Sequence, residues 1–197
     1  MTSPDLPAPT PTDARLANLV AALATDLADR VREATETAAG HRSAAPAALV
    51  ALHEFLDNAT MDQLRAAVGL TPSGAVRLVD RLAQQGYVER RAGTDARSVA
   101  LVLTPSGREA AVGVMAARTE AVATVISKLS SDERKTLTDV AENLLRIVTE
   151  QRLVARDGGV RPTGGWLCRL CDTEACGRAR GDCPAADAAT NHLSATV

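Results

Sequence analysis

The spacing of the apolar residues changes at Gly86, and this change restricts the possible fold more than any other feature of the chain. Before Gly86, apolar residues recur every three or four positions, which is the period of a helix packed on one side. After it, residues 87–91 and 98–103 alternate with a period of two, which is typical of strands. The polar segment 92–97 between them has the composition of a hairpin loop. We therefore expect helices followed directly by a β-hairpin.

Two short helices with clear start signals precede the hairpin. Thr60 and Gln63 form a capping box, in which each side chain satisfies a free backbone N–H. That helix should end at Gly69, and Thr71 followed by Pro72 starts the next one. Two helices joined by a tight turn form a helix-turn-helix, and a hairpin directly after it is a wing. The predicted fold class is mainly α with a small β-hairpin wing (α+β).

Long amphipathic helices flank this winged helix-turn-helix. They are expected at about residues 13–39, 105–128 and 131–154. Their apolar stripes lie outside the small winged domain, and exposed stripes of this kind are usually buried against a symmetry mate. We therefore interpret them as long dimerisation helices of a homodimer.

The charge distribution favours a nucleic-acid partner for the winged segment. The chain as a whole carries a net charge of −2, whereas residues 71–108 hold six arginines against three acidic residues, a local balance of +3. A basic segment in an acidic chain is what a DNA-binding surface requires.

The helix that begins after Thr71 has two different sides. Its predicted apolar stripe consists of Val76, Val79, Leu82 and Ala83. Its predicted polar side carries Ser73, Arg77, Arg81 and Gln84. Arginine can pair with guanine edges or phosphates, and a serine near a helix N-terminus can meet a phosphate oxygen. Such a face is also common on ordinary solvated helices, but the hairpin directly downstream favours DNA recognition.

In order and spacing, several of these elements resemble the signature of the MarR family. The matching residues are Leu78-Val79-Asp80-Arg81-Leu82, Gly86-Tyr87-Val88-Glu89-Arg90, Asp95-Ala96-Arg97 and Leu103-Thr104-Pro105-Ser106-Gly107. The resemblance covers roughly residues 13–155. It implies a homodimer that binds a near-palindromic operator on double-stranded DNA, usually as a repressor released by a small-molecule effector or an oxidant.

The resemblance also implies which residues contact DNA. Arg97 would enter the minor groove from the wing, and the exposed side of the preceding helix would face the major groove. The family often has two arginines after the wing aspartate, and here Ala96 replaces the first. Asp80 is expected to pair with a nearby arginine instead of a base. The candidate DNA-binding residues are Thr71, Ser73, Arg77, Arg81, Gln84, Arg90 and Arg97.

All the cysteines of the chain lie in its C-terminal tail, which predicts a metal-binding site made of Cys168, Cys171, Cys176 and Cys183. A Cys-x-x-Cys pair lets two sulfurs converge on one ion, and the second half can complete a tetrahedron. Zinc is the favoured cofactor. An iron–sulfur cluster is the second reading, because a cysteine followed by Pro184 is similar to ferredoxin-type ligation. Free or disulfide-switching thiols are the third. His192 could replace a ligand, although such a histidine is usually a surface residue.

The expected domains follow from these features. Residues 1–12, in which four prolines oppose a helix, are expected to be disordered. The remaining segments are an N-terminal dimerisation helix (13–42), a winged helix-turn-helix DNA-binding domain (43–104), C-terminal dimerisation helices (105–156), a linker (157–165) and a cysteine-rich metal-binding tail (166–197).

Other functional classes fit less well. The sequence contains no catalytic motif, so we do not expect an enzyme. An iron–sulfur redox-sensing regulator stays open, as does a metal-cluster electron-transfer protein on a helical scaffold, although the latter leaves the wing unexplained. Whether the cysteine site is structural or sensory is also open. With no run long enough to span a membrane and no signal-peptide pattern, the expected location is the cytoplasm.

Overall fold

The computed structural model describes residues 10–93, 99–160 and 164–195. Its α-helices are α1 (Pro11–Ala39), α2 (Ala45–Glu54), α3 (Met61–Val68), α4 (Pro72–Gln84), α5 (Pro105–Ile126), α6 (Ser131–Asp157) and α7 (Pro184–Ala195). A short 3-10 helix, η1 (Arg178–Arg180), precedes α7. Strands β1 (Val88–Ala92) and β2 (Val99–Leu103) pair antiparallel, with Val88 opposite Leu103. No helix of these residues is long and apolar enough to cross a membrane.

Local capping determines where most of these helices begin, as the sequence predicts. The Thr60 hydroxyl accepts the backbone N–H of Gln63, and the Gln63 side chain accepts that of Thr60. Thr71 caps α4 in the same way through its hydroxyl. Ser130 and Glu133 form a second predicted capping box at the start of α6. Each of these contacts spans three residues, so the sequence alone reveals it.

Two helix starts differ from expectation. The first helix begins at Pro11 and not at Asp13, because Thr10 caps it and proline is tolerated at the first helical position. The tail contains α7, which the sequence analysis did not predict. Its first residue is Pro184, so α7, like α1, begins with a proline. Pro11 was expected to oppose a helix, and Pro184 was considered only as part of a ferredoxin-like cysteine motif, although proline also starts helices.

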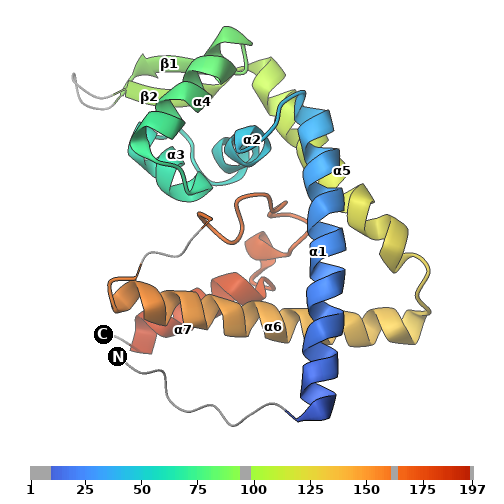
Figure 1. The fold of residues 1–197 in the computed structure, drawn as a ribbon. Helices are drawn as coiled ribbons and strands as arrows, with labels where there is room; N and C mark the ends of the chain where they lie inside the picture. Colours follow the sequence, from blue (N-terminus) through green and yellow to red (C-terminus); the bar gives the residue numbers. More distant parts are fainter. Residues whose placement is uncertain (1–9, 94–98, 161–163, 196–197) are drawn as a thin grey trace.

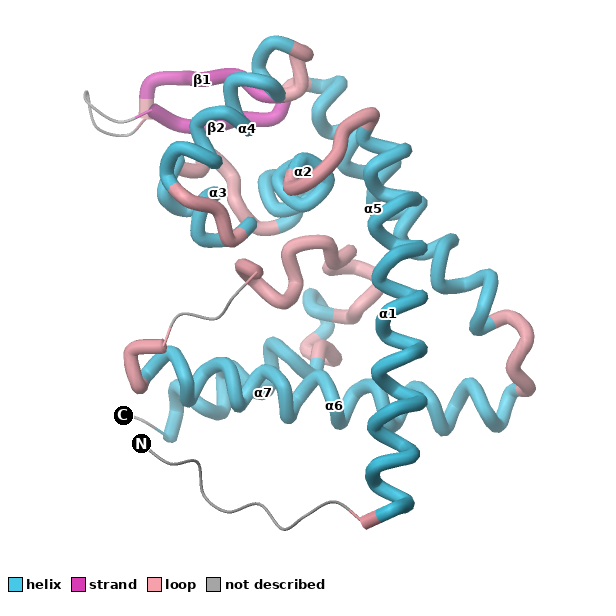
Figure 2. The backbone as a smooth tube through the Cα atoms, in the orientation of Figure 1, coloured by secondary structure: helices cyan, strands magenta, loops and turns pink. Residues whose placement is uncertain are grey.

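The helices are arranged in two groups (Figure 1). The short helices α2, α3 and α4 and the β-hairpin form a cluster at one end, and α1 packs along α5 beside it. At the other end α6 runs across the molecule, with α7 packed along it. The loop that enters the tail passes between the winged cluster and α6 (Figure 2). This loop therefore lies between the two groups of helices and links them.

A single apolar core lies in the winged cluster. Its fully buried side chains come from every element around it, which are Leu49 and Val50 of α2, Leu64 of α3, Val79 and Leu82 of α4, Val88 of β1, Leu101 of β2 and Val114 of α5. Leucine, valine and alanine fill this core almost alone. The low aromatic content of the chain predicted such helical packing, and the structure confirms it.

The long helices expose much of their apolar surface. On α6 only Leu153 is buried, and on α1 the buried residues are Thr35 and Ala39 at its C-terminal end. The exposed apolar residues of α1 are Leu16, Leu19, Val20 and Leu23. Those of α6 include Leu137, Val140, Leu144, Leu145, Ile147 and Val148. The single chain thus leaves two long apolar stripes facing solvent.

Candidate nucleic-acid interface and cysteine cluster

Helix α4 presents a polar face because its other face is fixed in the core. Ala75, Leu78, Val79 and Leu82 are buried, at the spacing of one helical stripe. Turning this stripe inward leaves five of the predicted DNA-binding residues exposed together. They are Thr71, Ser73, Arg77, Arg81 and Gln84.

One part of the predicted stripe was wrong. Val76 was expected in the core, but 44% of it is exposed, and Ala75 and Leu78 occupy the buried positions instead. Ala83 is half-buried. The run 75, 78, 79, 82 follows the three-and-four spacing of a helix, and Val76 lies one residue away from it. Val76 is therefore an apolar side chain beside Arg77 on the exposed face, where it could contact the methyl group of a thymine.

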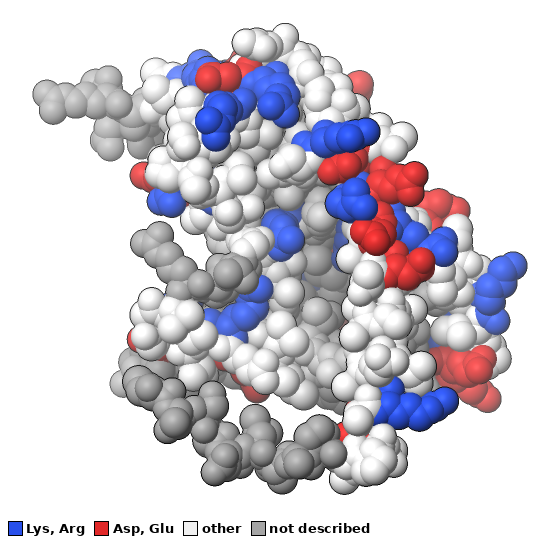
Figure 3. Space-filling view, in the orientation of Figure 1, with Lys and Arg blue, Asp and Glu red and all other residues white. Residues whose placement is uncertain are grey.

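Two of the arginines near this face carry ion pairs. Arg90 of β1 donates to the Asp80 carboxylate of α4 at 2.6 Å, as expected for this aspartate. Arg91 donates to Glu89 on its own strand. By contrast, Arg77 and Arg81 form no ion pair with another described residue. Basic side chains gather over α4 with an acidic group between them (Figure 3). The charge available to a partner is thus concentrated on α4.

The wing begins as an ordered hairpin beside α4. Leu101 and Leu103 are buried, whereas 50% of Val99, the first residue of β2, is exposed. Leu101 also donates its backbone N–H to Ala59, which ties β2 to the segment before α3. The predicted wing residue Arg97, with Asp95, lies outside the described residues.

The end of the hairpin is locked to the start of α5. The Thr104 hydroxyl donates to the Gly86 carbonyl at 2.5 Å, and Ser106 donates to the same oxygen at 3.0 Å. At Gly107 an added Cβ would collide with the backbone carbonyl of Tyr87. The threonine, serine and glycine of this motif therefore hold the wing at a fixed angle to α5.

The cysteine tail docks on the winged cluster from below. Trp166 donates its backbone N–H to the Ala67 carbonyl at the end of α3, at 2.7 Å. Arg152 of α6 donates to the Gly165 carbonyl. Leu170 packs against the apolar core. Residues far apart in the sequence thus position the first half of the tail.

The four thiols lie within one short segment of the tail. The Cys171 backbone N–H donates to the Cys168 carbonyl at 2.8 Å, which closes a turn between these two cysteines. The Cys176 thiol donates to the Thr173 carbonyl at 3.6 Å. Among the described residues, however, no three metal-ligating side chains already stand in a metal-binding arrangement. The structure thus gathers the predicted ligands in one segment without a finished tetrahedron.

Three of the thiols differ in pKa because their surroundings differ. The pKa of Cys171 is lowered to about 6, chiefly by the hydrogen bond from Cys168 and further by the positive charges of Arg118 and Arg178. The same hydrogen bond and burial raise the pKa of Cys168. Burial also raises the pKa of Cys176. Cys171 is therefore the most readily ionised of these three thiols.

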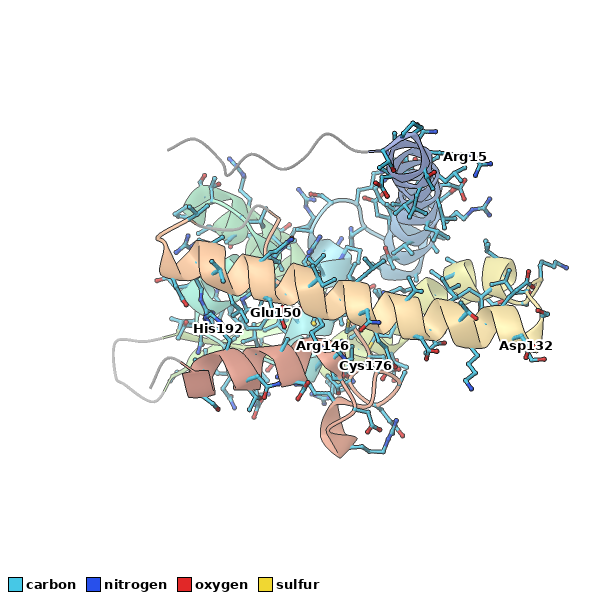
Figure 4. All side chains as sticks on the ribbon, turned by 90° about the horizontal axis from the view of Figure 1, so that it is seen from below. Arg15, Asp132, Arg146, Glu150, Cys176 and His192 are labelled. Carbon is cyan, nitrogen blue, oxygen red and sulfur yellow. The ribbon has the colours of Figure 1, made fainter. Side chains whose placement is uncertain are left out.

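His192 is not placed among the cysteines. Its Nε2 lies 2.6 Å from a carboxylate oxygen of Asp157, so it joins α7 to the end of α6. Figure 4 shows Cys176 near the start of α7 and His192 toward its other end. The imidazole therefore connects two helices in this structure.

Comparison with known proteins finds similarity to one family. Residues 43–98 match the MarR family. A curated relative, the uncharacterised HTH-type transcriptional regulator YwhA of Bacillus subtilis (strain 168), is 30% identical over 86 residues, which is 43% of this chain and 62% of the relative. The chain thus matches less than two thirds of that relative.

Solved structures show the same fold. A MarR family protein from Bacillus stearothermophilus superposes with a TM-score of 0.61 at 27% identity, covering 70% of this chain and 96% of that one. The F27L mutant of S. aureus MepR, bound to an oligodeoxyribonucleotide, gives a TM-score of 0.54 at 18% identity, covering 68% and 97%. The resemblance to the MarR family and the predicted winged-helix fold class are confirmed.

Proposed function

We propose that this chain, which matches the MarR family over residues 43–98 and has the fold of its solved members, is a transcriptional regulator that binds double-stranded DNA as a homodimer. It acts by binding and not as an enzyme. The observation that carries the proposal is the exposed face of α4, where Arg77 and Arg81 form no ion pair with another described residue.

The arrangement of α4 suits binding in the major groove of DNA. A helix fits the groove when its apolar side is held by the protein and its polar side is free, and α4 meets both conditions. Arg77 and Gln84 are three to four residues from other exposed polar positions, so several side chains can reach base edges at once. The hairpin beside α4 would place Arg97 near the adjacent minor groove. MepR, with the same fold, was solved on an oligodeoxyribonucleotide.

A second copy of this chain is the proposed partner of the exposed apolar stripes. Those stripes extend from Leu16 to Leu23 on α1 and from Leu137 to Val154 on α6. Pairing them across a two-fold axis would remove the apolar surface from water and present two α4 helices to DNA. A symmetric protein would then recognise a near-palindromic operator with half-sites about one turn of DNA apart.

Repression is the proposed direction of regulation. A dimer seated on an operator near a promoter blocks polymerase, and a small-molecule effector that changes the distance between the two α4 helices would release it. The support for this part is the resemblance to the MarR family, since the described residues do not identify an effector.

The first test is selective DNA binding by the full-length chain. Duplexes selected from a random pool should share a near-palindromic sequence. On the selected duplex, Arg77→Ala should weaken binding by about 5- to 150-fold, corresponding to about 1–3 kcal/mol for a lost base contact. Arg97→Ala should also weaken binding and reduce its salt dependence. Fluorescence anisotropy at several salt concentrations measures both quantities.

The matched control is Arg134→Ala, which removes the same charge from an exposed position at the start of α6. It should leave affinity nearly unchanged. If Arg77→Ala and Arg97→Ala both bind as tightly as the parent with the same salt dependence, the proposed DNA-binding surface is wrong.

A further inference from the structure

The cysteine tail has a feature that DNA binding does not require. All four thiols of the chain lie between residues 168 and 183, in the segment whose backbone passes between the winged cluster and α6 (Figure 2). Cys183 is buried, and the other three are partly buried. We propose that Cys168, Cys171, Cys176 and Cys183 bind one zinc ion as thiolates, and that this site fastens the tail to α2 and α3 of the winged cluster.

The donor set fits zinc. Structural zinc sites are closed tetrahedra, often of four thiolates, with the first two ligands separated by two residues as in Cys168 and Cys171. Cys183 is buried and the other three thiols are partly buried, so all four are at least partly shielded from water. Because the described residues hold no completed set of ligands, zinc binding would draw the four thiols together. The turn between Cys168 and Cys171 is in place, with the Cys171 N–H donating to the Cys168 carbonyl at 2.8 Å.

The residues between the cysteines hold the contacts with the winged cluster. Thr173 donates its backbone N–H to the Glu54 carboxylate at 2.8 Å and its hydroxyl to the same oxygen at 2.5 Å. The Arg178 guanidinium lies 5.6 Å from the centre of the Phe55 ring. The Trp166 and Phe55 rings pack edge-to-face, with ring centres 6.3 Å apart. Zinc binding would therefore fix the shape of residues 166–183, the segment that contacts the C-terminal end of α2.

This segment needs an internal link to hold its shape. Between Trp166 and Cys183 its only helix is η1, three residues long, and the four cysteines form no disulfide. Short segments without a core of their own usually depend on a metal or cross-link to fold. Zinc would supply that link within the ligand-bearing loop, and α7 would continue from Cys183 along α6.

The test of the site is metal content of the full-length chain purified without air. We expect about one zinc per chain, with no visible colour. Replacement by cobalt(II) should give the absorption bands of a tetrahedral thiolate site. Cys171→Ser and Cys176→Ser should each lose the metal, while His192→Asn should keep it. Four titratable thiols without metal, paired disulfides, or loss of zinc in His192→Asn would overturn the four-thiolate site. Iron with sulfide and a brown absorbance would overturn the assignment to zinc.

The test of the fastening role is hydrogen exchange with and without zinc. Removing the metal with a chelator should speed exchange roughly tenfold or more at residues 54–56 and 166–183. Exchange in the β-hairpin should change little. Thr173→Val removes the hydroxyl hydrogen bond to Glu54 and leaves the backbone one and every thiol in place, so it should keep zinc and still speed exchange at residues 54–56. Unchanged exchange at residues 54–56 in both experiments would overturn the fastening role. Neither readout depends on DNA, so this inference can fail while the proposed function holds.

Discussion

At the residue scale, Gly107 explains why a glycine follows the threonine and serine of the motif at the start of α5. The first turn of α5 passes so close to the Tyr87 carbonyl that a Cβ would collide with backbone, and it would also lie 3.1 Å from a methyl group of Leu103. Backbone atoms cannot rotate away as side chains can. The glycine is therefore required by packing and not by a left-handed conformation.

Gly107→Ala is expected to destabilise the protein by about 1–3 kcal/mol, the usual cost of overpacking. For a chain of this length the unfolding midpoint should fall by roughly 2–4 °C for each kcal/mol. Gly113→Ala is the matched control on the same helix, because nothing lies within 4 Å of its added Cβ. That change should raise the midpoint, since alanine is favoured over glycine in a helix by about 1 kcal/mol. Equal midpoints for the two variants would contradict the close approach at Gly107.

The ion pair of Asp80 with Arg90 is the other informative contact at this scale. It joins α4 to β1 across ten residues of sequence. Because both side chains are partly exposed, the pair contributes little stability. The ion pair orients Arg90 and reduces the unpaired positive charge of β1, so that α4 carries most of the unpaired charge beside the hairpin.

At the element scale, capping decides where α3 and α6 begin. The two capping boxes are alike except that Gln63 is neutral and Glu133 is an acid. Hydrogen bonds from the backbone and the hydroxyl of Ser130 lower the pKa of Glu133. A carboxylate whose pKa is lowered by folding stabilises the fold above its unfolded-state pKa, and this contribution is lost as the pH falls through the folded-state value.

Glu133→Gln should therefore cost stability at neutral pH and nothing in acid. The variant keeps a side-chain acceptor, as Gln63 does in α3, and removes only the charge near the positive helix N-terminus. Thermal unfolding by circular dichroism should show a lower midpoint than the parent at about pH 7, with the two midpoints converging below the ordinary carboxyl pKa of about 4.3. A difference that persists unchanged in acid would show that charge is not the cause.

At the scale of the whole molecule, the apolar stripes of α1 and α6 are the dominant feature. Leu137, Val140, Leu144 and Val148 follow one face of α6 at helical spacing and are all exposed. Exposed apolar surface of this extent on a single chain indicates an interface. The winged cluster has its own core and does not depend on these residues.

Leu144→Glu should split the proposed dimer into monomers. Placing a charge in the centre of an apolar interface leaves that charge buried and unpaired in the dimer. Light scattering of the full-length chain should show half the parent mass, with only part of the helical circular dichroism lost. Glu142→Gln, an exposed change on the same helix, should remain dimeric. A monomeric parent, or a dimer that tolerates Leu144→Glu, would refute this interface.

The sequence by itself determined the elements. The capping residues Thr60, Thr71 and Ser130 and the change of period at Gly86 predicted the order of helices and strands, because these signals act within three or four residues. The same reasoning predicted the exposed residues of α4 and the four cysteines as a group. It failed at Pro11, because proline both opposes and starts helices, and it did not predict the helix that begins at Pro184.

Only the tertiary structure decided what these elements touch. The contact of Thr173 with Glu54 joins residues 119 positions apart, and the ring of Phe55 receives both Trp166 and Arg178. Val76 is exposed because other residues of α4 pack into the core. Glycine is needed at position 107 because the backbone of Tyr87 passes close to it. Such contacts are set by how whole elements pack, and no local spacing in the sequence encodes them.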